Sequence, residues 1–233
     1  MDRKDHWAWQ SLTRPGLSRE QLLSHFRHEY ATYVRDFPVL LARLLGQGPP
    51  EPVRRALAAN IYEEQTGGLS FGTPHPELFL EMMSGLGFSR ADLEADTRSL
   101  EPEALAYRAL LDRVSAEPPW VVGAAVLTIF VEGSVHERAE LSGTRALPPI
   151  EDAIAAHPMV VHYGCPAERM RLARAHRAVE GGHRADAWSM VLDNAPGPLA
   201  DAVVAAVHEA HRAWLAYRDG VARAMGLARP AAG

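Results

Sequence analysis

The chain of 233 residues is 47% hydrophobic and has a net charge of −5, with its basic residues scattered along the sequence, so no nucleic-acid partner is expected. Its single cysteine, Cys165, excludes an intrachain disulfide and a thiolate metal cage, which is typical of a cytoplasmic protein. The N-terminus lacks the apolar stretch of a signal peptide, and the most apolar run, 120–131, is too short to cross a bilayer, so no membrane association is expected. These properties predict one domain over 1–233, with a disordered tail at about 229–233.

Helical periodicity recurs along the chain, whereas the alternating apolar and polar runs typical of strands are absent. Ser18 followed by Gln21 forms a capping-box pattern, which predicts a helix that runs to about residue 36. Glycine and proline clusters separate the later segments. The pattern predicts an all-α fold, with further helices at about 38–45, 52–65, 76–86, 102–115, 119–141, 150–156, 166–193 and 198–225.

The predicted helix at 166–193 carries the first candidate metal ligands. His176, Glu180 and His183 stand four and three residues apart, so they fall at roughly 0°, 40° and 340° around the helix and share one face. That face continues through apolar residues and is therefore the core side. Two imidazoles and a carboxylate are costly to bury unless a divalent cation binds all three. The pattern predicts a metal site, and an amphipathic helix with satisfied histidines is the competing interpretation.

Two adjacent glycines interrupt the same helix. Gly181 and Gly182 each cost about 1 kcal/mol relative to alanine in a helix interior. Close approach of another backbone or a ligand would explain both residues, and a simple kink is the alternative.

Two glutamates on other predicted helices are candidates for inward-facing carboxylates. Glu64 shares a face with Leu57 and Ile61, whereas Glu63 is turned about 100° away, so Glu64 is predicted to point inward. Glu132 ends the apolar run AAVLTIFVE. Because buried acids are rare unless paired, each is predicted to have a partner, either a metal ion or an arginine.

His75, near the start of the helix at 76–86, adds a further imidazole to this set. Carboxylate and imidazole ligands that project inward from separate helices are typical of dinuclear iron and manganese sites. Their hardness argues against copper(I) and against a structural zinc. The sequence therefore predicts a dinuclear centre in a helical bundle.

Several segments also carry a family resemblance. HWAWQSLTRPGLSREQLLSHFRHEYATYVRDFP is similar to the first helices of one family, and NIYEEQTGG with HPELF resembles the segment that gives its first Glu and His. FVE resembles the middle Glu segment, and HYGCP leads into HRAVEGGH, which resembles the signature of His, three residues, Asp, two residues, His. Nearly all of the chain thus resembles the haem-oxygenase-like diiron oxidases, which are iron-containing redox enzymes related to the thiaminase II and pyrroloquinoline-quinone-synthesis families. The resemblance implies a haem-oxygenase-like bundle of about seven helices.

The resemblance implies six ligands for two Fe(II) ions, with a manganese–iron pair as the alternative: Glu64, His75, Glu132, His176, Glu180 and His183. The sequence departs from the family at Glu180, where an Asp is usual. The gaps from Glu64 to His75 and from Glu132 to His176 are longer than is usual in the family, which indicates remodelled loops. His136, four residues after Glu132, is a rival to His75 as a ligand.

Members of this family react with O2 and oxidise small molecules in natural-product biosynthesis, by carbon–carbon cleavage, nitrile formation, N-oxygenation or decarboxylation. The expected partners are therefore O2, a small amino-acid-like or carboxylate substrate and, where the reaction needs one, an electron donor. Amino-acid-like substrates are slightly preferred, because a long acyl chain would require an extended apolar tunnel. A homodimer is the default oligomer. Candidates for lining the pocket or supporting the ligands are Thr128, Tyr62, His162 and Tyr163.

Two further functional classes stay open from the sequence. A cofactor-free oxidase or a thiaminase II-like enzyme would use the same bundle with organic chemistry alone. A non-enzymatic helical interaction protein would bury the same acids against arginines. Whether the six ligand residues converge on one cavity is the observation that bears most directly on these alternatives.

Overall fold

The computed structural model describes residues 1, 3–94 and 99–229, and for residues 180–183 it describes the backbone alone. Over these residues the chain is helical and contains no strand, which confirms the predicted all-α class. None of the helices in this described part is long and apolar enough to span a membrane.

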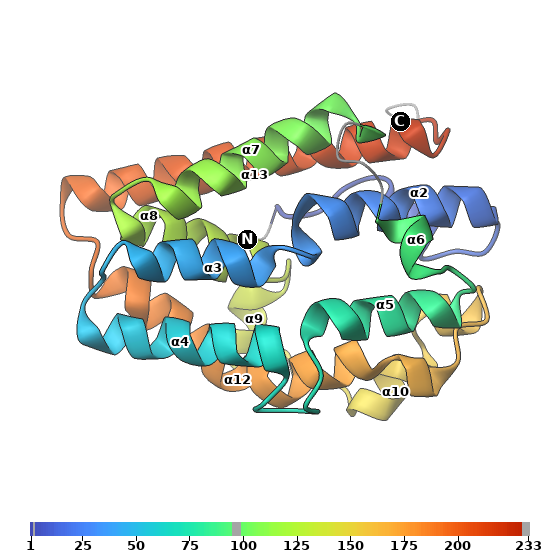
Figure 1. The fold of residues 1–233 in the computed structure, drawn as a ribbon, viewed down its shortest axis with the longest axis horizontal. Helices are drawn as coiled ribbons and strands as arrows, with labels where there is room; N and C mark the ends of the chain where they lie inside the picture. Colours follow the sequence, from blue (N-terminus) through green and yellow to red (C-terminus); the bar gives the residue numbers. More distant parts are fainter. Residues whose placement is uncertain (2, 95–98, 230–233) are drawn as a thin grey trace.

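The N-terminal part of the chain forms one side of the bundle. After the short α1 (Trp9–Leu12), α2 (Arg19–Glu29) continues directly into a π-helical segment, η1 (Tyr30–Val34), and α3 (Phe37–Gly46) follows. The capping box predicted for α2 is present, because Ser18 Oγ accepts from the backbone N–H of Gln21 and the Gln21 side chain accepts from the backbone N–H of Ser18. The helical path from α2 to α3 is nearly continuous (Figure 1).

A second pair of helices lies alongside the first. α4 (Glu51–Thr66) packs on α3, and α5 (His75–Gly85) continues beyond the end of α4 in Figure 1. Gly67 ends α4 with a φ of +63°, and a Cβ on it would lie 2.3 Å from the carbonyl oxygen of Thr73. Only glycine fits this close return of the chain. The short loop between α4 and α5 therefore folds back beside the end of α4.

Long helices complete the bundle. α12 (Arg171–Leu192) packs against both α4 and α5, while α7 (Pro102–Ala116) and α13 (Pro198–Ala224) lie side by side along the opposite edge (Figure 1). Between these two groups run α8 (Trp120–Ala124) and the π-helical η3 (Ala125–Val131), which contact α12 and α13. The remaining short α-helices are α6 (Arg90–Leu93), α9 (Glu137–Leu141), α10 (Ile150–Ala155) and α11 (Pro158–Val161).

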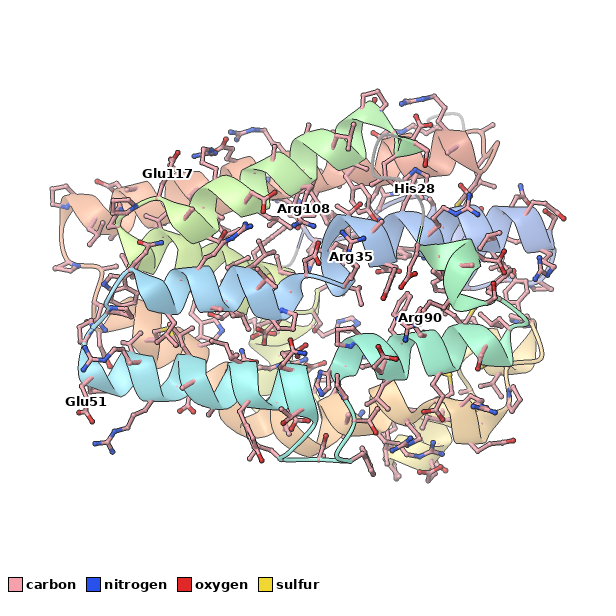
Figure 2. The ribbon with its side chains drawn as sticks, viewed as in Figure 1. His28, Arg35, Glu51, Arg90, Arg108 and Glu117 are labelled. Atoms are coloured by element: carbon pink, nitrogen blue, oxygen red, sulfur yellow. The ribbon has the colours of Figure 1, made fainter. Side chains whose placement is uncertain are left out.

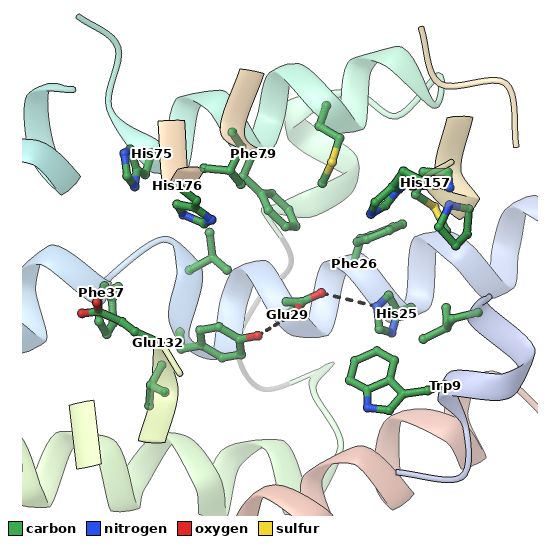
Figure 3. Close-up of a pocket in the computed structure, with 18 of the residues that line it drawn as sticks. Trp9, His25, Phe26, Glu29, Phe37, His75, Phe79, Glu132, His157 and His176 are labelled. Atoms are coloured by element: carbon green, nitrogen blue, oxygen red, sulfur yellow. Dashed lines mark hydrogen bonds and ion pairs between the residues drawn. The ribbon is translucent and has the colours of Figure 1, made fainter. Parts of the chain in front are cut away.

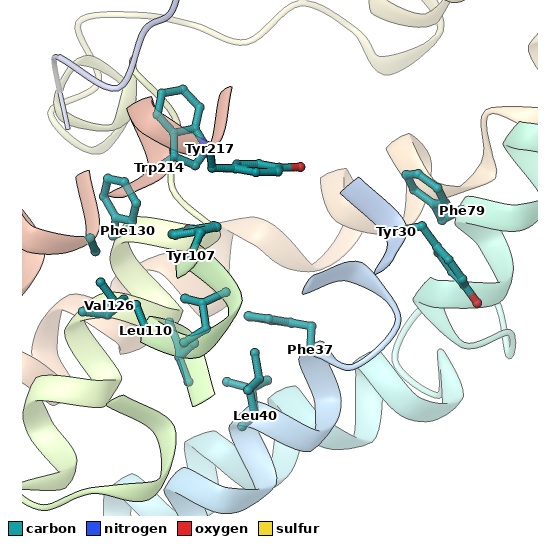
Figure 4. Packing of buried hydrophobic residues seen from close by; sticks show 14 of the residues in the cluster. Tyr30, Phe37, Leu40, Phe79, Tyr107, Leu110, Val126, Phe130, Trp214 and Tyr217 are labelled. Carbon is teal, nitrogen blue, oxygen red and sulfur yellow. The ribbon is translucent and has the colours of Figure 1, made fainter. Parts of the chain in front are cut away.

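The core combines aliphatic side chains with large aromatic rings (Figure 4). Tyr107 of α7 and Tyr217 of α13 stack with centroids 5.4 Å apart, and both rings are almost fully buried. Burying side chains of this size contributes about 25 cal/mol per Å² of apolar surface. This packing holds α7 against α13, and together they form one wall of the bundle.

Charged side chains lie on the exterior (Figure 2). Several of them form ion pairs between elements. Arg108 on α7 donates to Asp36 at 2.7 Å, and Asp36 also accepts from Arg35. These contacts tie α7 to the junction between η1 and α3. Exposed pairs such as Arg90 with Glu77 contribute little to stability, because water screens them.

Two predicted helices differ from the structure. The helix predicted at 119–141 is not continuous, because it stops at Val131 and α9 begins only at Glu137. The Nζ of Lys4 donates to the carbonyl oxygens of Phe130, Val131 and Gly133, so the N-terminal segment satisfies the last carbonyls of η3. Contacts from so distant a segment cannot be predicted from local periodicity.

The predicted start of the last helix but one, at Pro166, was also wrong. A short 3₁₀ segment, Ala167–Arg169, follows Pro166, and α12 begins at Arg171. Helices α1, α6 and α11 were not predicted, because four residues are too few to show a 3.6-residue period. The short helix predicted at 150–156 is present as α10.

Candidate metal centre and active-site cavity

His75 stands at the point where α5 begins. Pro74 precedes it and Pro76 occupies the first turn of the helix, where the missing N–H of proline is tolerated. The side chain is buried, with 3% of the residue exposed. The end of α4 and the start of α5 therefore present their side chains to the same place, facing α12.

Glu64, His75 and His176 come together from α4, α5 and α12. One ligand atom from each residue lies within 4.8 Å of the others. The Nδ1 of His75 is 2.8 Å from Oε1 of Glu64, and the rings of His75 and His176 meet edge to face with centroids 5.0 Å apart (Figure 3). Three residues predicted from separate parts of the sequence thus converge at one point.

Glu63 has a role that the sequence analysis missed. Its side chain is fully buried, with none of it exposed, and it accepts from the backbone N–H of Leu69 at 2.6 Å and from the hydroxyl of Ser70. Its Oε1 also lies 3.0 Å from Nε2 of His75. Burial acts to raise the pKa of Glu63, but these hydrogen bonds outweigh burial and the pKa is lower than usual. Glu63 is therefore a carboxylate that orients the ring of His75.

The donor set fits a first-row divalent cation. The Nδ1 of His75 is buried and makes no hydrogen bond of acceptable geometry, although Glu64 is adjacent. With Nε2 on Glu63 and Nδ1 facing Glu64, His75 has the arrangement of a metal-ligating histidine whose second nitrogen is held by a carboxylate. The separation of the three ligand atoms is close to what one cation spans, since its bonds to nitrogen and oxygen are about 2.0–2.2 Å long.

The neighbouring carboxylates also shift the pKa of His75. Burial lowers this pKa, but Glu64 and Glu63 together outweigh burial, and the pKa is raised. An environment of this kind stabilises positive charge at the imidazole, which is the charge that a cation would bring.

Glu132 follows η3 and lines the same cavity. It is half-buried, and its Oε1 accepts from Nδ2 of Asn60 at 3.0 Å. Asn60 lies one turn before Glu64 on α4, so α4 supplies both a candidate ligand and the amide that positions a second one. In Figure 3 the carboxylate of Glu132 lies on the side of the cavity that holds His75 and His176.

Glu180 and His183, the other two predicted ligands, lie outside the described side chains. Their backbone belongs to α12, one and two turns beyond His176. Their place in a metal site therefore stays a prediction. The same holds for the explanation of Gly181 and Gly182.

A cavity of about 530 Å³ extends from the three converging residues between α2, η1 and α12 (Figure 3). Its walls are mainly aromatic and aliphatic, with a few polar groups, as is usual in small-molecule sites. A smaller cavity of about 240 Å³ is adjacent, because His157 and His176 line both spaces. The described lining of the larger cavity comprises Trp9, Leu12, Thr13, His25, Phe26, Glu29, Tyr33, Val34, Phe37, Glu64, His75, Phe79, Met82, Val131, Glu132, His157, Pro158, Met159, Leu172 and His176.

The four predicted supporting residues lie elsewhere. Thr128 is buried, and its hydroxyl donates to the carbonyl oxygen of Ala124 within η3. Tyr62 is 53% exposed, and His162 is also exposed. Tyr163 donates to the carbonyl oxygen of Arg14 on the surface. None of the four is among the described residues that line the large cavity.

The break after η3 also decides the position of His136, the rival ligand. Its prediction assumed a continuous helix after Glu132, but residues 132–136 are not helical. His136 is exposed and precedes α9, and it is absent from the described lining of the cavity. Sequence reasoning also missed the cavity residues on α2, for which it predicted only the capping box and the helix itself.

A family comparison agrees with this geometry. A family model described as an iron-containing redox enzyme matches residues 24–218, which is most of the chain. The chain belongs to this family. The matched region includes α4, α5, η3 and α12, and therefore all six predicted ligands. The family supports an iron-dependent redox enzyme, as the resemblance of the sequence implied.

A solved structure has the same fold. The chain is similar to the crystal structure of a TenA homologue from Pseudomonas syringae pv. tomato, with a TM-score of 0.68 over 95% of this chain and 87% of that one. The two sequences are 15% identical, so the likeness concerns the fold alone. It confirms the predicted relation to the thiaminase II fold. No curated protein matches the chain.

Proposed function

We propose that this chain is a non-haem dinuclear iron oxidase or oxygenase that uses O2 to oxidise a small amino-acid-like or carboxylate substrate in natural-product biosynthesis. The observation that carries the proposal is the convergence of Glu64, His75 and His176 at one end of a cavity, with Glu63 behind His75. Buried carboxylates and imidazoles arranged in this way are costly without a cation.

The chain's own residues would hold two ions as follows. Glu64, His75 and His176 would bind one ion, and Glu132, which Asn60 positions, would face the second. Glu180 and His183 would complete the set from α12. When bound, ferrous ions supply the electrons that reduce O2, which amino-acid side chains do not readily supply.

The remainder of the cavity would bind the substrate and exclude water. Phe79 lies near His176, and Phe37 lies beside Glu132 (Figure 3). Leu172, one turn before His176 on α12, also lines the cavity. An apolar surface next to the ions lowers the local dielectric constant and strengthens the charge interactions there. The smaller cavity, which His176 also lines, would offer a molecule as small as O2 a second approach to this ligand.

Covalent catalysis by a thiolate has no support in this chain. Its single cysteine, Cys165, is buried beside Met170, and burial raises the pKa of the thiol. Cys165 is absent from the described lining of the cavity. A cofactor-free or thiaminase II-like reaction would therefore rely on the acids and histidines of the cavity alone.

Anaerobic loading with Fe(II), followed by removal of free metal and metal analysis, tests the proposal. We expect about two irons per chain in the wild-type protein and O2 uptake that exceeds the uptake by the same iron without protein. The His176→Ala variant should lose at least half of the bound iron, because its imidazole is one of the three converging ligands.

His208→Ala is the matched control, because His208 is an exposed histidine on α13, outside the described lining of the large cavity. It should bind as much iron as the wild type. A wild-type protein that retains no iron under these conditions would contradict the proposal and favour a cofactor-free enzyme or a helical interaction protein.

A further inference from the structure

A second polar cluster lines the cavity and is not used by the metal site. Glu29, the last residue of α2, lies 3.4 Å from Nε2 of His25 through its Oε2, and its Oε1 accepts from the hydroxyl of Tyr33 at 2.6 Å. The side chain of Glu29 is 20% exposed, whereas that of His25 is 5% exposed. In Figure 3 the carboxylate of Glu29 lies between His25 and the candidate ligands.

Glu29 is an ionised carboxylate. Burial acts to raise its pKa, but His25, Arg218 and Tyr33 outweigh burial and lower the pKa to about 2. Tyr33 stays a donor, because burial and the charge of Glu29 raise the pKa of its phenol well above the usual value. Each carboxylate oxygen has two acceptor positions, so His25 and Tyr33 leave room for further donors on both oxygens.

The described lining of the cavity offers Glu29 histidines but no side chain that is always positively charged. This lining contains no lysine or arginine. Arg218 lies behind the wall, where its guanidinium packs 4.2 Å from the ring centroid of Trp9. It stabilises the charge of Glu29 from the protein side and leaves the cavity side open. The cation that would complete this site must therefore come with the ligand.

The residues around Glu29 indicate the chemical character of the rest of the ligand. Trp9, Phe26 and Met159 line the cavity with apolar surface, and its volume of about 530 Å³ is that of a small-molecule site. A ligand that fits has an apolar body and a donor group at one point. An inorganic cation does not use such walls.

We propose that Glu29, supported by Tyr33 and His25, binds the ammonium group of an amine substrate whose apolar body lies along the aromatic wall toward the candidate metal ligands. This inference names the substrate class and rests on the proposed function for the oxidation of that substrate. It assigns Glu29 to substrate binding and not to metal binding.

Calorimetric titration of the full-length, metal-free protein with three matched probes tests the site without any turnover. The probes are 2-phenylethylamine, 2-phenylethanol and phenylacetate, of which only the amine is a cation at pH 7.5. We expect the amine to bind at least tenfold more tightly than the alcohol and the acid to bind more weakly still. Equal binding of amine and alcohol would overturn the proposal even if no variant folds.

Variants then locate the amine. Glu29→Gln should weaken binding of the amine at least tenfold and leave binding of the alcohol unchanged, whereas Glu117→Gln, an exposed control, should change neither. Unchanged amine binding by a folded Glu29→Gln protein would refute the assignment.

Loading with Mn(II) separates this site from the metal cluster. We expect the loaded protein to bind the amine at least as tightly as the metal-free protein. Loss of amine binding on loading would show that the amine occupies the Glu64 cluster and would overturn the proposal. The titrations need no iron, so they test the amine site separately from the proposed function. If the protein binds the amine but no iron, the proposed function fails and this inference stands.

Discussion

Oε1 of Glu63 lies 3.0 Å from Nε2 of His75, and both side chains are buried. Glu64, the next residue in the sequence, faces the other ring nitrogen, so two consecutive glutamates contact one imidazole. Adjacent residues on a helix point about 100° apart, yet both contact the same ring on its two nitrogens. The ring reaches both because it enters from the start of α5.

Glu63→Gln should weaken the binding of Mn(II) or Fe(II) by roughly 10- to 100-fold, because residues that hold a metal-ligating histidine in place have effects of this size. Chelator competition gives the affinity. Glu51→Gln, on the exposed first turn of the same helix, is the control and should bind metal as the wild type does. An unaltered affinity in a folded Glu63→Gln protein would mean that the carboxylate only supports the loop at 69–70.

The stabilising effect of Glu29 should depend on pH. Its pKa is about 2 in the folded protein against an ordinary value of 4.5, so the unfolded chain takes up a proton first as the pH falls. The stabilisation is complete above about pH 5 and is lost as the pH falls toward 2. Urea unfolding between pH 6 and 3.5 should show the advantage of the wild type over Glu29→Gln shrinking by up to about 1.4 kcal/mol per pH unit. A constant difference would count against an ionised Glu29.

Lys4 is the chain's single lysine, and its amine is held by the carbonyl oxygens of Phe130, Val131 and Gly133. Lys4→Met should lower the free energy of unfolding by about 2 kcal/mol, since the end of η3 loses its donor. The amine should also react with an acylating reagent at least about tenfold more slowly in the native protein than in urea, as followed by mass spectrometry. Equal rates in both states would show that the N-terminal segment does not stay on η3.

Gly123 lies at a close contact between α8 and α7. A Cβ on it would lie 2.2 Å from the carbonyl oxygen of Val114, so Gly123→Ala must push two backbones apart and should destabilise the protein by about 2 kcal/mol or more. A Cβ on Gly46, at the end of α3, would meet nothing within 4 Å. Gly46→Ala should therefore be neutral or stabilising by less than about 1 kcal/mol, and thermal unfolding of the pair checks the contrast.

The longer helices and half of the candidate site could be predicted from local pattern. Ser18 with Gln21 gave the start of α2, and the angular argument that chose Glu64 put it at the point where His75 and His176 meet. These predictions succeeded because a buried helical face imposes its period on the sequence.

The rest depended on contacts between distant segments. Lys4, from the N-terminal segment, donates to the carbonyl oxygens at the end of η3. The predicted helix that had made His136 a candidate ligand stops at this point. Glu64 was chosen over Glu63 as the inward carboxylate, and the burial of Glu63 was missed because the loop after α4 folds back and supplies the N–H of Leu69 to it. No spacing within α4 could show that a loop would bury a carboxylate on its other side.

The π-helical segments η1 and η3 set the rotational phase of two cavity carboxylates. η1 begins directly after Glu29, and η3 ends directly before Glu132. A π turn amounts to one extra residue in an α-helix, and each residue accounts for about 100° of rotation. Removing a single residue from 125–131 would let η3 wind as an ordinary α-helix. The helix before it would then be rotated by about a quarter of a turn relative to Glu132. A one-residue deletion would therefore give a regular α-helix here, but it would turn the Glu132 carboxylate away from the cavity.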